Sequence, residues 1–305
     1  MNVGSEFLNG LHEPEEYLRV VTKSLVDPVW WAENVVDVTL FPAQAEIMRE
    51  FYRNNYKRLI LVAGMRSGKS TLAALMATYE FWRLYVLPDP AKRYGLFRKQ
   101  PIFISVIATS EKQAEDAVFA NIRTLIEDCS WFGEDVKVKD AIVECRAKNI
   151  YIRLLSSWST TAVGRSNKAV VFDELALFEE TSGKRGAWEV FSRLSKSTDT
   201  FGRDGKIIAI SSPKHPNDII MTLYRQLKED RETLALMKPT WEMNPNYTKE
   251  ALMEEHKYDL AAFWRDYACQ PQVTNALQFP EGVETVPMVN VLDERVEDQL
   301  SLIHI

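Results

Sequence analysis

The sequence predicts an α/β protein whose mainly parallel β-sheet is flanked by helices. Four short apolar runs, at 58–64, 102–108, 168–174 and 206–213, have the continuous hydrophobicity of strands that are buried on both faces. Helical patterns separate these runs along the chain. Buried strands that alternate with helices are typical of a parallel sheet, because each parallel connection needs a crossover.

The other elements follow in order. We predict helices at 14–25, 43–53, 69–85, 110–128, 187–195, 216–229 and 248–268. We also predict an antiparallel strand pair at 141–146 and 150–156, and a short strand at 233–239. Residues 88–101 begin and end with proline and are predicted to form a loop.

Composition excludes several classes of protein. The chain has 305 residues, of which 46% are hydrophobic and 26% charged, so it is neither collagen-like nor disordered. It carries 37 basic and 43 acidic residues, a net charge of −6, so any nucleic-acid contact must be local. Cys129, Cys145 and Cys269 form no CxxC pair, which favours a reduced setting without zinc. We expect neither a membrane span nor a signal peptide.

A phosphate-binding loop, the Walker A motif, follows the first buried strand. The stretch AGMRSGKST (63–71) fits the pattern, although Ala63 stands at its first glycine position. The predicted nucleotide-binding residues are Gly64, Met65, Arg66, Ser67, Gly68, Lys69, Ser70 and Thr71. Lys69 is expected to reach the β- and γ-phosphates of the nucleotide, and Ser70 to bind Mg²⁺. A chance match is the alternative, and the strand before and helix after the loop count against it.

Two acids end the third buried strand, as in a Walker B motif. Ligands bind at the carboxyl ends of parallel strands, so we expect Asp173 to hold Mg²⁺. Glu174 is then expected to orient and deprotonate the attacking water. The alternative is a plain helix-capping acid, and the phosphate loop upstream favours hydrolysis.

Two weaker signals lie near these motifs. Ser211, Ser212 and Pro213 end the fourth buried strand, where hydroxyl groups can contact the γ-phosphate or its water and pass the contact on. An ordinary turn explains them equally well. Phe41 and Gln44 precede the first strand and suit an adenine, by stacking and by hydrogen bonding. A helix start with a hydrophobic staple is the alternative.

Together these motifs resemble the ATPase half of the large terminase subunit of tailed bacteriophages and related viruses. The resemblance covers residues 35–270 and is carried by LFPAQ, GMRSGKST, VVFDE and ISSP in that order. It implies a RecA-like (ASCE) P-loop NTPase fold that binds ATP and Mg²⁺ and drives double-stranded DNA into an empty procapsid. It also implies the portal protein and the small terminase subunit as partners, and a ring, often pentameric, that assembles from monomers. The implied location is the host cytoplasm and transiently the portal, not the mature virion.

The resemblance also implies roles for single residues. Glu174 becomes the catalytic carboxylate, and Ser211–Pro213 the segment that couples hydrolysis to movement. Arg66 can sense the γ-phosphate within its own subunit. Arg165, shortly before VVFDE, can be an arginine finger that reaches a neighbouring subunit, or it can pair with a surface carboxylate. The sequence leaves open which arginine acts.

The expected organisation has four parts. These are an N-terminal helical segment (1–34), the P-loop ATPase core (35–214), a lid subdomain (215–270), and a linker that begins a missing nuclease domain (271–305). The last part is too short for a nuclease domain, so we expect no nuclease activity. A helicase- or repair-type ATPase is an alternative, but it needs a second RecA-like lobe. A further alternative is an ATP-binding fragment with little turnover alone.

Overall fold

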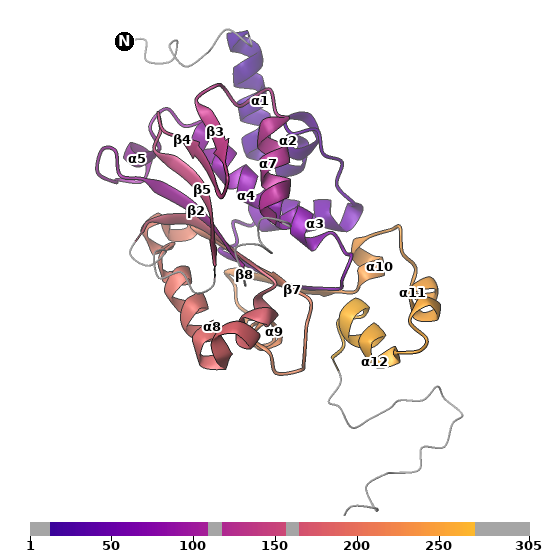
Figure 1. Ribbon diagram of the computed structural model, residues 1–305. Coiled ribbons are helices and arrows are strands. Elements are labelled where there is room, and N and C mark those ends of the chain that lie inside the picture. Colours follow the sequence, from indigo (N-terminus) through magenta and orange to yellow (C-terminus); the bar gives the residue numbers. More distant parts are fainter. Residues whose placement is uncertain (1–12, 109–117, 157–164, 272–305) are drawn as a thin grey trace, which may run out of the picture. The chain divides into compact units, whose positions relative to one another are not determined.

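One eight-stranded sheet organises the described part of the chain, in the order β3-β4-β5-β2-β6-β7-β1-β8. The computed structural model (Figure 1) describes residues 13–108, 118–156 and 165–271, apart from the side chains of 179–185. The strands are β1 Arg58–Ala63, β2 Ile102–Ala108, β3 Val136–Lys139, β4 Ile142–Cys145, β5 Ile150–Ser156, β6 Asn167–Asp173, β7 Lys206–Ser211 and β8 Thr233–Lys238. β3 pairs antiparallel with β4 and β4 pairs antiparallel with β5 at one edge, and all other pairs are parallel.

Helices cover both faces of the sheet (Figure 1). The first face carries α1 Pro14–Val26, α2 Pro28–Asn34, α3 Pro42–Arg53, α4 Lys69–Tyr85 and α7 Ala120–Glu127, and α8 Phe178–Lys196 and α9 Ile219–Leu227 cover the second. Short helices complete the described part, namely α5 Pro90–Arg93, α10 Thr240–Met243, α11 Lys249–Glu255, α12 Leu260–Ala262, a π-helix Phe263–Tyr267, and 3₁₀ turns Leu175–Leu177 and Asp199–Asp204. The result is a three-layer arrangement that contains a parallel sheet.

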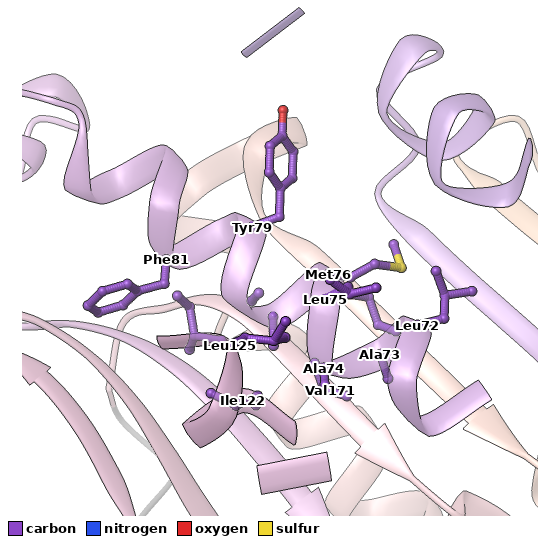
Figure 2. Packing of buried hydrophobic residues seen from close by; sticks show 14 of the residues in the cluster. Leu72, Ala73, Ala74, Leu75, Met76, Tyr79, Phe81, Ile122, Leu125 and Val171 are labelled. Carbon is purple, nitrogen blue, oxygen red and sulfur yellow. The ribbon is translucent and has the colours of Figure 1, made fainter. Parts of the chain in front are cut away.

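Helix α4 begins directly after the phosphate loop and is almost wholly buried. In Figure 2 its side chains lie with Ile122 and Leu125 of α7 and Val171 of β6, and all belong to one hydrophobic cluster. Such close packing holds the helix against the sheet. Lys69, the first residue of α4, therefore starts from a fixed backbone position.

A buried ionic network anchors the other end of α4. Glu80 Oε2 lies 2.5 Å from Lys168 Nζ of β6, and both side chains are fully buried. Arg83 lies 2.8 Å from Glu80 Oε1 and 3.4 Å from Asp204 Oδ1. Burial disfavours the Glu80 charge, but the Arg83 and Lys168 charges outweigh it and lower the pKa of Glu80 to about 2. The network thus ties α4 to β6.

Most of the predicted elements are confirmed, and some boundaries were wrong. The parallel sheet, the antiparallel pair and the helix at 69–85 are all present. The sequence missed α2, α5, β3 and α10, which are too short for a clear periodicity. Residues 109–117 of the predicted helix 110–128 lie outside the described residues, and α8 begins at Phe178 rather than at 187.

The predicted helix at 248–268 is broken. It divides into α11 and α12 because the Asp259 side chain accepts a hydrogen bond from Ala262 N at 2.9 Å and starts a new helix there. None of the helices in the described ranges is long and apolar enough to cross a bilayer. The division of the chain into four parts stays a prediction.

Candidate nucleotide-binding site

Three adjacent parallel strands end at one edge of the sheet and bring the predicted motifs together. β7 lies between β6 and β1, with Val62 beside Ser211 and Ile210 beside Asp173. The acidic pair that ends β6, the serines that end β7 and the phosphate loop after β1 therefore meet. This is the edge at which ligands bind in open parallel sheets.

The phosphate loop has the backbone shape of an anion site. Gly68 has φ of +79°, and the non-glycine Arg66 has φ of +59°. Among the described residues, no acceptor receives the amide hydrogens of Lys69, Ser70 or Thr71 at the start of α4. These amides and the positive end of the α4 dipole remain available to a phosphate. Met65, Arg66 and Thr71 are exposed, Ser70 is half-buried, and Ser67 is buried.

Lys69 links the phosphate loop to the ends of both neighbouring strands. Its Nζ lies 2.9 Å from Glu174 Oε1 and donates to Ser212 Oγ at 3.0 Å. Ser212 Oγ in turn donates to the carbonyl of Ala63 at 3.0 Å. The Lys69 side chain is only 8% exposed. A nucleotide phosphate that binds the Lys69 ammonium group would have to replace Glu174 as its ion-pair partner.

Glu174 sits in a strained and well-supported position. Its φ of +50° is left-handed, which is uncommon for a residue with a side chain. Ser212 N donates to its Oε2 at 3.3 Å, and the Ser211 hydroxyl lies within hydrogen-bonding distance of the same oxygen, at 3.2 Å, and of Ser212 O, at 2.9 Å. The two predicted coupling serines therefore hold one carboxylate oxygen while Lys69 holds the other, and Pro213 follows them as a buried residue.

Asp173 has the properties of a metal ligand. It is 4% exposed, and its Oδ1 has no hydrogen-bond partner among the described residues. Burial and the neighbouring Glu174 charge raise the pKa of Asp173 to about 7. A buried carboxylate oxygen without a partner, close to a phosphate loop, fits a divalent cation. Asp173 and Ser70 would hold it.

The back of the phosphate loop is bound by residues that the sequence did not single out. Thr240 Oγ1 donates to Met65 O at 2.8 Å, and Asn244 Nδ2 donates to Arg66 O at 2.9 Å. Met65 N donates to Asp266 O at 2.6 Å. We call Thr240, Asn244 and Asp266 the loop clamp. They come from α10, its end and the π-helix, and no sequence motif marks their role.

Gly64 is a glycine because of the loop clamp. A Cβ atom on Gly64 would lie 2.2 Å from Thr240 Oγ1 and 2.5 Å from Tyr267 O. Its amide donates to Lys238 O at 3.2 Å. The nucleotide contact predicted for Gly64 stays a prediction, and its amide is engaged at the back of the loop.

The two residues predicted to contact adenine, Phe41 and Gln44, differ in burial and in their hydrogen bonds. Phe41 is half-buried, just before α3. Gln44 is 4% exposed, and both ends of its amide are engaged. Its Oε1 accepts from Phe41 N at 3.0 Å, and its Nε2 donates to Gly68 O at 3.0 Å. Gln44 thus supports the phosphate loop directly, and its contact with adenine stays a prediction.

The two candidate arginines lie in different places. Arg66 is exposed in the loop, with its Nη1 3.8 Å from Glu255 Oε1. Arg165 is exposed before the amino end of β6, over the Phe103 ring at 5.2 Å. β6 runs from Asn167 to Asp173, so Arg165 and the acidic pair lie at its opposite ends, which are roughly 20 Å apart at about 3.3 Å per residue. The structure therefore does not bring Arg165 to the site of its own chain.

The sheet order, the phosphate loop after β1 and the acidic pair after β6 define a RecA-like P-loop domain. The family model described as "Uncharacterized protein MJ0330, N-terminal P-loop domain" matches residues 27–269, and the chain belongs to this family. A search of curated proteins found no match.

Solved structures similar to this chain include large terminases of bacteriophages. The Thermus phage P74-26 large terminase ATPase domain has a TM-score of 0.56 and 19% identity, over 79% of this chain and 97% of that one. The HK97 bacteriophage large terminase has a TM-score of 0.58 and 14% identity, over 82% of this chain and 54% of that one. The bacteriophage D6E large terminase in complex with ATP-gamma-S has a TM-score of 0.54 and 13% identity, over 76% and 53%. This chain spans about half of the latter two, and the similarity confirms the RecA-like fold.

Proposed function

We propose that this domain hydrolyses ATP at the site between β1, β6 and β7. The observation that carries the proposal is the position of Lys69 Nζ, 2.9 Å from Glu174 Oε1 and 3.0 Å from Ser212 Oγ. A phosphate-binding lysine and a candidate base thus lie together at the mouth of a phosphate loop. The bound ATP-gamma-S named for the D6E terminase supports ATP as the nucleotide.

The reaction begins with exchange of partners at Lys69. The phosphates of ATP bind the amides at the start of α4 and draw Lys69 away from Glu174. The freed Glu174 accepts a proton from a water molecule as that water attacks the γ-phosphorus. The bond to the β–γ bridging oxygen breaks, and ADP and phosphate leave. Ser211 and Ser212 keep the carboxylate aimed during this step.

Asp173 and Ser70 would hold Mg²⁺ beside the phosphates. The ion supplies charge neutralisation on the β- and γ-oxygens. The raised pKa of Asp173, about 7, means that the buried carboxyl is only partly ionised near neutral pH without such a cation.

We further infer that hydrolysis serves the movement of double-stranded DNA into a viral procapsid. The shared fold with terminase ATPase domains supports this. The distance of Arg165 from its own site favours a finger that acts on a neighbouring subunit in a ring. The portal protein and small terminase subunit would be the partners, in the host cytoplasm.

Steady-state ATP hydrolysis tests the enzymatic proposal. Glu174→Gln should bind ATP and lose turnover, because an amide cannot accept the proton. Lys69→Ala should lose both affinity and turnover. Near-normal turnover in Glu174→Gln would show that another group is the base. Turnover per subunit that rises with protein concentration would indicate a ring completed by neighbours, and constant turnover would indicate a self-contained site.

A further inference from the structure

The loop clamp orients the phosphate loop through its peptide groups. Peptide units are planar, and here they are trans, so the C=O and the following N–H point in opposite directions. Thr240 holds Met65 O and Asn244 holds Arg66 O at the back of the loop. The N–H groups of Arg66 and Ser67 therefore point away from the clamp.

We propose that Thr240 and Asn244 are positioning residues that aim the amides of Arg66 and Ser67 at the nucleotide phosphates. This inference rests on the proposed nucleotide site and adds a second set of residues to it. Neither side chain touches the phosphates itself. Each acts through one carbonyl of the loop.

The side-chain amide of Asn244 is held in one orientation. It is 9% exposed, and its Oδ1 accepts from Asn246 N at 3.1 Å. That contact fixes which end of the amide faces Arg66, so Nδ2 is the end that donates to the Arg66 carbonyl at 2.9 Å. Arg66 needs the support, because its left-handed conformation, with φ of +59°, is unfavourable for a residue that has a Cβ.

Thr240 has an equally specific environment. It is fully buried, and Gly64 lacks the Cβ that would meet Thr240 Oγ1 at 2.2 Å. The hydroxyl can therefore reach Met65 O at 2.8 Å. Gly64 thus leaves space for the Thr240 hydroxyl at the back of the loop, and the two positions are complementary.

Titration calorimetry of the full chain with Mg²⁺ and ATP-gamma-S, a slowly hydrolysed ATP analogue, tests the inference. Asn244→Ala and Thr240→Val should each weaken binding by about tenfold, the loss expected when a charge-assisted hydrogen bond to phosphate is misdirected. Thr240→Ser keeps the hydroxyl and should bind like the wild type. Asn246→Ala keeps the backbone N–H that Asn244 uses and should also bind normally.

Thermal unfolding without nucleotide separates positioning from folding. The variants should remain folded at the temperature of the titration, and Thr240→Val and Thr240→Ser give a matched pair if Asn244→Ala is unstable. Binding within twofold of the wild type in folded Asn244→Ala and Thr240→Val would overturn the inference. So would equal losses in Thr240→Ser and Thr240→Val. A wild type that binds but never hydrolyses ATP would contradict the proposed function alone, and one that does not bind would overturn both.

Discussion

At the scale of residues, the candidate base is held by three contacts. Lys69 holds one oxygen of Glu174, and Ser211 and Ser212 hold the other. Only the Lys69 contact competes with the phosphates of a nucleotide. The serine contacts can persist through the reaction, so they are expected to act on the rate of hydrolysis rather than on nucleotide affinity.

Ser211→Ala tests this separation. Without its hydroxyl, Glu174 loses one donor to Oε2, and we expect kcat to fall by about tenfold with KM nearly unchanged. Steady-state kinetics gives both constants, and Thr222→Ala, which removes a hydroxyl from α9, is the control. A rise in KM with unchanged kcat would mean that Ser211 supports binding instead.

At the scale of elements, the buried Glu80–Lys168–Arg83 network makes the attachment of α4 sensitive to acid. The pKa of Glu80 is lowered to about 2 from an ordinary 4.5. The stabilisation is fully present above the pKa of the unfolded state and is lost as pH falls from about 4.5 towards 2. Protonation of Glu80 in the folded state therefore lowers the stability of the fold.

Glu80→Gln should lower the free energy of unfolding at neutral pH by roughly 3–5 kcal/mol, because it leaves buried cations without their partner. It should also flatten the pH dependence of stability between about 4.5 and 2. Urea unfolding from pH 7 down to about pH 2 measures both effects. Glu33→Gln, at an exposed position, is the matched control. A Glu80→Gln curve parallel to that of the wild type would contradict the assignment.

At the scale of the whole molecule, the site is incomplete if Arg165 serves a neighbour. Arg165 and the acidic pair lie at opposite ends of β6. A subunit that lacks Arg165 keeps its own Glu174, and a subunit with Glu174→Gln keeps its Arg165. A mixture of the two can therefore form complete sites at mixed interfaces.

Mixing Arg165→Ala with Glu174→Gln should restore ATP hydrolysis above the sum of the separate variants. The assay is turnover at a constant total protein concentration and varied ratio of the two. A finger in trans is worth about 10³-fold or more in rate, so partial restoration is measurable. Arg19→Ala, an exposed arginine on α1, should be active alone. Absence of any restoration would exclude action in trans.

The sequence by itself determined the local chemistry and the class of fold. Continuous apolar runs predicted the parallel strands, and the order of the motifs predicted that Lys69, Glu174 and the serines at 211 and 212 share a site. These signals are readable because they depend on residues close together in the chain: a strand, the turn after it, and the helix that follows.

Only the tertiary structure decided which groups support the loop. Thr240 lies 175 residues after Met65 in the chain, and Asn244 lies 178 residues after Arg66. Gln44 donates a hydrogen bond from its side-chain amide to Gly68 O. Their hydrogen bonds go to backbone carbonyls, which every residue has. A sequence motif therefore cannot predict these contacts. The separation of Arg165 from its own site likewise depends on the direction and length of β6. Contacts of this kind exist only once the sheet has set the order of its strands.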